Sequence, residues 1–346
     1  MSAIREAIQA LVSGVRVEPS LLGRAFGEIM DGEASPATAA GLLVGLRMKG
    51  ETVEEIVAVA EALRARATLT EPADPRTIDT CGTGGSGLDT FNISTTSAFV
   101  VAGAGVSVAK HGNRAATSRS GSFDVLEALG IRIDLPIPTY GRILAEVGIA
   151  PFFARTAHPA FKHVAPVRAE LGVRTLLNCL GPLLSPVGAR YQVVGVYAGE
   201  LVEPLAEALG RLGAERALVV HGSDGMDEFT TTGPSQAALY AGSKVEPMHV
   251  DPGALGLAPA QLEDLAGGTP EENARTTRAI LDGEVGPRRD IVLLNAAAAL
   301  FVVERASSLE EGLSLAAESI DSGAARGKLE ALARATGQAS PEEVFA

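Results

Sequence analysis

A polar segment with two prolines, Glu71–Pro75, divides the chain into two parts with different hydrophobic patterns. Before it, apolar side chains recur at helical spacing and no strand-like run occurs. After it, short β-branched runs alternate with helical stretches, as in the strand-like 106–110 and the helical 122–129. This alternation is typical of an α/β domain with a mainly parallel sheet. We therefore predict a small all-helical N-terminal domain over residues 1–70 and a larger α/β domain over residues 76–346.

Local signals place the ends of several helices. Ser35 before Pro36 is typical of a helix start, because serine caps the first turn and proline fits its first position. Thr52 followed by Glu55 is the pattern of a capping box at the start of another helix. The alternation further predicts strands at 77–81, 131–135, 149–154, 191–197 and 217–220. It predicts helices at 92–101, 139–147, 160–171, 202–212, 270–282, 290–303 and 309–335.

The overall composition argues against several classes of protein. Hydrophobic residues make up 46% of the chain, which indicates a packed globular protein rather than a disordered one. The net charge of −13 argues against a nucleic-acid-binding surface, which would be basic. No apolar run reaches the roughly 18 residues of a membrane span, and the N-terminus has no apolar signal core. Cys81 and Cys179 stand far apart, so we expect buried thiols in a soluble cytoplasmic protein rather than disulfides.

A glycine-rich segment with many hydroxyl side chains, Asp79–Thr96, is the first candidate binding motif. An extended run leads into four glycines within six residues, and Asn92 then opens a helix. Glycines let a backbone approach a ligand closely and point several N–H groups at one anion. The helix start adds free N–H groups and a positive dipole end. The segment therefore indicates a phosphate site, although a glycine-rich turn before a polar helix cap has the same composition.

A second motif, Val108–Ser122, carries four potential cations and a cluster of hydroxyls directly after a strand. In α/β sheets, ligands bind beyond the carboxyl ends of the strands. This motif and the glycine-rich segment are therefore expected to face one crevice. Lys110 and His111 adjoin an apolar strand, which favours burial at a site over a solvated basic loop.

Two further segments supply acids and cations. An apolar strand runs into His221–Glu228, whose three carboxylates suit a hard cation such as Mg²⁺, although a solvated acidic turn is equally consistent with them. In the segment 155–172, Lys162, His163 and Arg168 are predicted to lie along one helix. An arginine that faced the crevice could bind a carboxylate through two hydrogen bonds, whereas an isolated surface arginine is the commoner case.

Seven motifs in one order resemble the anthranilate phosphoribosyltransferase family over nearly the whole chain, including the helical N-terminus. The motifs are Gly82–Gly85, Asn92–Thr95, Lys110–Arg114, Ser120–Ser122, His158–Arg168, Gly181–Leu183 and Asp227–Glu228. The resemblance implies that the larger domain is of the nucleoside-phosphorylase and phosphoribosyltransferase type. It implies that helices from about 160–185 return to the helical domain, so that the connection acts as a hinge. It also implies a homodimer through the helical domains.

The reaction that the resemblance implies joins anthranilate to phosphoribosyl pyrophosphate, giving N-(5-phosphoribosyl)anthranilate and pyrophosphate in tryptophan biosynthesis. The family pattern places phosphoribosyl pyrophosphate on Gly82, Gly85, Thr90, Asn92, Ser94, Thr95, Lys110, Ser118 and Ser122. We expect Ser86, in the same glycine-rich loop, to contact it as well. It places anthranilate on Gly82, His111, Asn113, His158 and Arg168. It places Mg²⁺ on Ser94, Asp227 and Glu228, and it assigns catalysis to Lys110, Asn113 and Arg168. From the acidic charge and the lack of an apolar span, we expect no nucleic-acid or membrane partner.

Ser86 departs from the family pattern, which commonly has Gly-Gly-Asp-Gly in this loop. A carboxylate near the pyrophosphate and the metal is therefore missing, so the sequence leaves the number of Mg²⁺ ions open. Two other functions also remain open at this point. A pyrimidine nucleoside phosphorylase shares the fold and a Thr-Gly-Gly loop, but usually has Lys-His-Ser before that loop, where this chain has Asp79–Gly82. A non-catalytic paralogue that binds nucleic acid is expected to have a basic surface.

Overall fold

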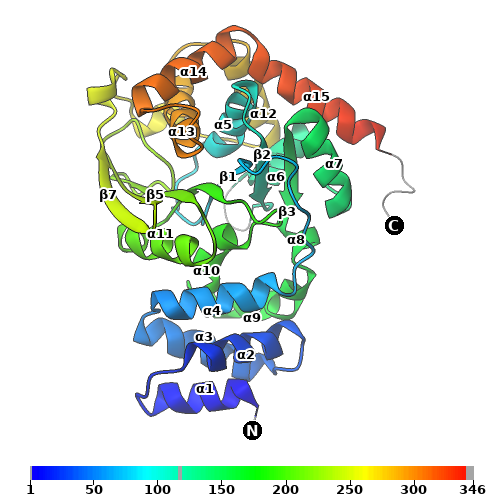
Figure 1. The fold of residues 1–346 in the computed structure, drawn as a ribbon, viewed down its shortest axis with the longest axis vertical. Coiled ribbons are helices and arrows are strands. Elements are labelled where there is room, and N and C mark those ends of the chain that lie inside the picture. Colours follow the sequence, from blue (N-terminus) through cyan, green and yellow to red (C-terminus); the bar gives the residue numbers. More distant parts are fainter. Residues whose placement is uncertain (1, 116–118, 340–346) are drawn as a thin grey trace.

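The structure, a computed structural model, describes residues 2–115 and 119–339. Four helices form the N-terminal part, at one end of the molecule (Figure 1). They are α1 (Ala3–Val12), α2 (Pro19–Met30), α3 (Pro36–Lys49) and α4 (Val53–Arg64). Both predicted caps are present, because Ser35 Oγ accepts the N–H of Thr38 at 3.3 Å, and Thr52 and Glu55 form a capping box. The prediction that the N-terminal part is all-helical is therefore confirmed.

The second part is built on a seven-stranded sheet in the order β3-β2-β1-β4-β5-β6-β7. The strands are β1 (Ile78–Gly82), β2 (Val108–Gly112), β3 (Ile149–Phe153), β4 (Tyr191–Gly195), β5 (Arg216–Gly222), β6 (Ser235–Ala241) and β7 (Lys244–Val250). The first five strands pair in parallel, whereas β6 and β7 are antiparallel. The prediction of a small helical part and a larger α/β part with a mainly parallel sheet is thus confirmed. Because the chain goes from β1 out to β3 and returns to β4, the sheet switches direction between β1 and β4.

Helices pack on both faces of this sheet (Figure 1). The longer ones are α5 (Ile93–Gly103), α7 (Ile137–Val147), α11 (Val202–Arg211), α12 (Pro270–Leu281), α13 (Pro287–Val302), α14 (Leu309–Asp321) and α15 (Ala324–Gln338). The short ones are α6 (Ser122–Ala128), α8 (Ala154–Ala157), α9 (Ala165–Leu171), α10 (Leu177–Leu180) and the 3₁₀ turns η1 (Pro159–His163), η2 (Gly181–Leu184), η3 (Gly199–Leu201), η4 (Gly253–Leu255) and η5 (Leu262–Leu265).

Two hydrophobic clusters hold these layers together. One lies around α5 and α13 and includes Phe99 and Leu294. The other continues from the N-terminal helices through Leu183 into Val194 of β4 and Leu205 of α11. The N-terminal helices and one face of the sheet therefore share a core.

The segment after β3 returns to the N-terminal helices, where η1 contacts α2 and α9 contacts α3. α9 lies beside the N-terminal helices in Figure 1, far along the sequence from them. In the part of the chain that the structure describes, no helix has the length and apolar character needed to cross a membrane.

The strand predicted at 131–135 is wrong. Its apolar side chains are buried, as their alternation suggested, but no neighbouring strand pairs with it among the described residues. The N–H of Ile131 donates to the carbonyl of Leu126, and two other N–H groups donate to side chains. The N–H of Arg132 donates to Thr336 Oγ1 and that of Leu135 donates to Tyr140 Oη, each at 3.2 Å. A segment packed between helices can show the same alternation of apolar and polar residues as an edge strand, so the pattern does not distinguish the two.

Two predicted helices are divided. Pro166, which has no N–H, lies in the first turn of α9, so Lys162 and His163 belong to η1 and do not share a helix with Arg168. Gly323, with φ +78°, separates α14 from α15. The β6–β7 hairpin was not predicted, and its two-residue turn, 242–243, has positive φ at both positions.

Candidate active site

The glycine-rich loop follows β1, where the sheet changes direction. Gly84 and Gly85 have φ of +67° and +80°, a region that glycine enters without steric cost. Gly82 ends β1, and a Cβ built on it would lie 2.5 Å from Asp227 Oδ2. At the end of β4, a Cβ on Gly195 would overlap the backbone oxygen of Asp227. Glycine at these two strand ends therefore allows the loop after β5 to approach β1 and β4.

The two acids of that loop contact different parts of the predicted phosphate site. Asp227 Oδ2 accepts the N–H of Gly84 at 2.9 Å. Glu228 Oε1 accepts the N–H of Ser94 at 3.2 Å, in the first turn of α5. The structure thus brings the three predicted metal ligands, Ser94, Asp227 and Glu228, together beside the glycine-rich loop.

These ligands fit a magnesium ion. Burial, followed by the charge of Asp227, raises the pKa of Glu228 to about 7, against the opposing charge of Lys110. A divalent cation between the carboxylates would relieve that repulsion. The described residues contain no group of three or more His, Cys, Asp or Glu side chains arranged to hold a metal. Mg²⁺ does not need such a group, because it keeps several waters and binds through one or two carboxylates together with substrate phosphates.

Lys110 supplies the buried positive charge of the site. Its side chain is 4% exposed, and Nζ donates to the carbonyl of Thr80 at 2.6 Å. Burial raises the pKa of Asp79 to about 7, and the charge of Lys110 is the largest effect that opposes this shift. Thr95 lines the same small cavity as Lys110, and its buried Oγ1 has no hydrogen-bond partner among the described residues. A positively charged donor and an unpartnered hydroxyl therefore line one small cavity between α5 and β2.

Asn92 connects the two predicted phosphate motifs. Its Oδ1 accepts the Ser120 hydroxyl at 3.2 Å and Asn273 Nδ2 at 2.9 Å. Ser122, at the start of α6, donates its hydroxyl to the Asn113 carbonyl at 3.1 Å. The loops after β1 and β2 are therefore tied together beyond the carboxyl ends of their strands.

The remaining residues predicted for the sugar substrate lie around these loops. Thr90 forms an isolated backbone bridge to Ala266, and Ser86 is half-buried within the glycine-rich loop. The carbonyl of Gly85 accepts a hydrogen bond from Arg174 Nη2. Ser118 lies outside the described residues.

Two imidazoles lie in contact on the other face of β2. The ring centroids of His111 and His158 are 5.4 Å apart, in a T-shaped arrangement. Burial, the dominant cause for both, lowers the pKa of His111 to about 3 and that of His158 to about 4, so both rings are neutral at pH 7. His158 Nε2 lies 2.9 Å from the carbonyl of Leu184. Because a carbonyl only accepts, Nε2 carries the proton and Nδ1 presents a lone pair.

These rings keep unused hydrogen-bonding capacity. His111 Nε2 and His158 Nδ1 are buried and have no hydrogen-bond partner within the described residues. Buried polar atoms without partners are costly, so they mark a place where a ligand would make hydrogen bonds. This is the position predicted for the aromatic acceptor.

The positions of Arg168 and Asn113 give less direct evidence for acceptor binding than those of the two imidazoles. Arg168 is half-buried on α9, burial lowers the pKa of its guanidinium, and no ion pair joins it to a carboxylate in the described part of the chain. Asn113 is exposed after β2, where its Oδ1 accepts the N–H of Arg114. No hydrogen bond between described residues joins either side chain to the imidazoles, so their role in acceptor binding stays a prediction.

Two residues at the site were not among the predicted site residues, although Asp79 opens the first candidate motif. Asp79 is fully buried in β1, and its Oδ1 accepts the N–H of His111 at 3.0 Å. Its signal was an acid inside an otherwise uncharged strand. Arg174 holds the glycine-rich loop through Gly85 and stacks on the Tyr197 ring, 4.3 Å from its centroid. No local pattern marks Arg174, because its partners lie in other segments.

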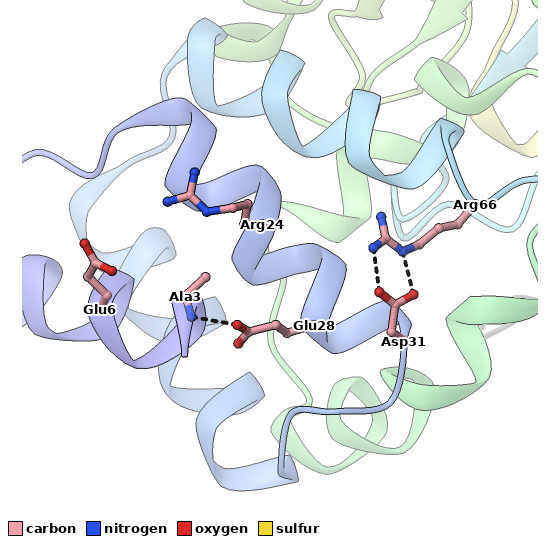
Figure 2. A pocket seen from close by; sticks show the side chains of 6 residues that line it. All are labelled: Ala3, Glu6, Arg24, Glu28, Asp31 and Arg66. Atoms are coloured by element: carbon pink, nitrogen blue, oxygen red, sulfur yellow. Dashed lines mark hydrogen bonds and ion pairs between the residues drawn. The ribbon is translucent and has the colours of Figure 1, made fainter. Parts of the chain in front are cut away.

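A separate pocket of about 480 Å³ lies on the N-terminal helices (Figure 2). Two of its acids, Glu28 and Asp31, already have partners. Glu28 accepts the N–H of Ala3 at 2.6 Å, and Asp31 pairs with Arg66. None of the predicted site residues that the structure describes lines it.

Comparison with known proteins agrees with this geometry. Residues 5–67 match the helical bundle domain of a glycosyl transferase family, and residues 74–326 match its a/b domain. The anthranilate phosphoribosyltransferase of Symbiobacterium thermophilum is 55% identical over 302 residues, which are 87% of this chain and 89% of that protein. That of Moorella thermoacetica is 51% identical over 329 residues, which are 95% and 97% of the two chains.

Solved structures show the same likeness. The anthranilate phosphoribosyltransferase of Thermus thermophilus superposes with a TM-score of 0.92 at 45% identity, covering 97% of this chain and 100% of that one. The Saccharomyces cerevisiae enzyme in complex with PRPP and Mg superposes with a TM-score of 0.89 at 27% identity, covering 97% and 98%. Neither a nucleoside phosphorylase nor a nucleic-acid-binding protein is supported. The chain belongs to this glycosyl transferase family and, within it, to the anthranilate phosphoribosyltransferases.

Proposed function

We propose that the chain transfers the phosphoribosyl group of phosphoribosyl pyrophosphate to anthranilate, with Mg²⁺ as the cofactor. One observation carries the proposal. The glycine-rich loop, the start of α5, Lys110 and the pair Asp227–Glu228 meet at one edge of the sheet, where β1 and β4 end. Ligands bind at such switch points in α/β sheets.

The diphosphate would lie on the loop 82–87 and the first turn of α5. Gly84 and Gly85 hold their amides in conformations that let several N–H groups converge on one anion. The N-terminus of α5 adds its dipole, and the ammonium of Lys110 adds a buried charge. These groups stabilise negative charge that grows as pyrophosphate leaves, which is electrostatic preorganisation.

Ser94, Asp227 and Glu228 would hold the metal. When bound, Mg²⁺ supplies further neutralisation of the charge that develops on the leaving pyrophosphate. The carboxylates also fix the loop geometry, since Asp227 bonds to Gly84 and Glu228 bonds to Ser94.

Anthranilate would bind on the side of His111, His158 and Arg168. Its aniline nitrogen is largely unprotonated at neutral pH, so no strong general base is needed. The neutral His158 can accept a hydrogen bond at Nδ1, which suits an amine donor. Arg168, half-buried without a carboxylate partner among the described residues, suits the carboxylate of anthranilate.

The proposal includes the organisation expected from the sequence. Residues 1–70 form a helical domain joined by helices from about 160–185, and residues 76–346 form the substrate-binding domain. Hinge motion between them excludes water from the reacting sugar. The protein acts as a cytoplasmic homodimer joined through the helical domains.

The test follows the loss of anthranilate fluorescence after phosphoribosyl pyrophosphate and Mg²⁺ are added. A loss of fluorescence that requires the enzyme, phosphoribosyl pyrophosphate and Mg²⁺ together supports the proposal. One control omits the metal, and a second replaces the substrates with thymidine and phosphate and measures phosphorolysis of thymidine. Unchanged fluorescence in the complete mixture, with the enzyme folded, would overturn the proposal.

A further inference from the structure

Three consecutive carbonyls of the turn η2 each accept a hydrogen bond from a different element. The carbonyl of Pro182 accepts from Gln192 Nε2 at 2.8 Å, and that of Leu183 accepts from Arg64 Nε at 2.7 Å. The carbonyl of Leu184 accepts from His158 Nε2 at 2.9 Å. The turn is thereby fixed to β4, to α4 and to the segment between α8 and η1.

Arg64 makes the longest connection in this group. It ends α4 in the helical N-terminal part, and its acceptor on η2 is 119 residues away. Its Nη1 donates at 2.9 Å to the carbonyl of Leu212, at the end of α11. Burial lowers the pKa of its guanidinium. The planar guanidinium of arginine can donate hydrogen bonds to two carbonyls in different directions, whereas the ammonium of lysine is a compact charge at a single point.

The η2 turn links Arg64 to His158, at the predicted acceptor site. Leu183, which Arg64 holds, is directly followed by Leu184, which fixes the His158 tautomer. Burial is the largest cause of the lowered pKa of His158, and the charge of Arg64 contributes in the same direction. Arg64 is therefore tied to His158 through hydrogen bonds and through charge.

We propose that Arg64 is a positioning residue for the acceptor: by holding the Leu183 carbonyl, it sets the η2 turn on which His158 is oriented. This inference rests on the proposed function, since it names a residue that acts on anthranilate binding through His158. Arg64 itself is assigned no contact with a substrate. The alternative interpretation is that Arg64 has only a structural role, joining the helical part to the sheet.

The chain offers a matched control for that alternative interpretation. Arg211 also joins α4 to α11, through its ion pair with Glu54 at 3.0 Å, but none of its partners among the described residues lies in η2. Arg64→Met and Arg64→Lys are compared with Arg211→Met. Thermal unfolding is measured for each, and steady-state KM is measured for both substrates.

We expect Arg64→Met to raise the KM for anthranilate about tenfold, which corresponds to about 1.4 kcal/mol. The KM for phosphoribosyl pyrophosphate should change less than about twofold. Arg64→Lys should restore part of the loss, because the charge and one hydrogen bond remain. Arg211→Met should leave both constants unchanged.

A double variant separates positioning from simple support. If Arg64 acts through His158, Arg64→Met should add no further increase in the anthranilate KM to that of His158→Ala. Additive effects, or equal increases for both substrates, would overturn the role of Arg64. If Arg64→Met does not fold, Arg64→Lys decides by the same comparison. A folded wild type without turnover of anthranilate would instead overturn the proposed function itself.

Discussion

Gly82→Ala tests whether the approach of Asp227 to the glycine-rich loop matters for the sugar substrate. The new Cβ would lie 2.5 Å from Asp227 Oδ2, whereas ordinary contact begins at 3.4 Å, so the carboxylate must move by about 0.9 Å. Its hydrogen bond to the N–H of Gly84, now 2.9 Å, would then be lost. Hydrogen bonds to charged groups contribute about 1.5–3 kcal/mol, so kcat/KM should fall between about tenfold and a hundredfold.

The assay measures initial rates at saturating anthranilate while phosphoribosyl pyrophosphate and Mg²⁺ are varied. We expect Gly82→Ala to lower kcat/KM for the sugar substrate and to raise the Mg²⁺ concentration needed for half-maximal rate. The control is Gly327→Ala in α15, where the new Cβ would contact no other element of the described chain within 4 Å. A folded Gly82→Ala enzyme with wild-type kcat/KM and metal dependence would refute the reasoning.

Further substitutions test the other parts of the site. Asp227→Ala combined with Glu228→Ala should abolish turnover and leave thermal unfolding cooperative; retained activity would remove both from the metal site. Arg168→Ala should raise the KM for anthranilate at least about tenfold more than that for the sugar, and equal changes would reject its role. Arg174→Ala should raise the KM for phosphoribosyl pyrophosphate several-fold, because it releases the carbonyl of Gly85; an unchanged KM would contradict this. Without metal, Glu228→Gln should stabilise the fold at pH 8 but not at pH 4.5, by at most about 3 kcal/mol, and equal gains at both pH values would exclude titration of Glu228.

The sign of the Glu228 effect follows from the direction of its shift. The folded-state pKa of this acid is raised from 4.5 to about 7. The folded protein therefore binds a proton that the unfolded chain has released, and stability is lost as pH rises from about 4.5 to about 7. Above pH 7 both states are ionised and the penalty is constant. Glutamine cannot ionise, so it removes the penalty only where the carboxylate would be charged.

Signals within a few residues were enough to predict much of the fold. Ser35 and Thr52 cap helices through bonds to residues three positions ahead, so the sequence alone contains the interaction. The strand at 131–135 fails for the opposite reason. Its alternation reports burial, but the sequence does not say whether a strand or a helix covers it, and here Thr336 lies 204 residues from Arg132.

The candidate site shows the same division. The loops after β1 and β2 could be assigned from their own composition, since glycines and hydroxyls after a strand suit a phosphate wherever the chain goes next. Arg174 and Arg64 could not, because their acceptors lie 89 and 119 residues away. An arginine gains its role here from a carbonyl it meets only in the folded state.

The charge of the site explains how an acidic protein can hold a diphosphate. Asp227 and Glu228 lie against the amides that would bind the anion, so a diphosphate without a cation would meet both attraction and repulsion there. Burial and the charge of Asp227 already raise the pKa of Glu228 to about 7. A bound diphosphate would raise the pKa of Glu228 further. Only a cation shared by the carboxylates and the diphosphate changes their mutual repulsion into net attraction. Binding of the sugar substrate should therefore require Mg²⁺ more strongly as pH rises and Glu228 ionises.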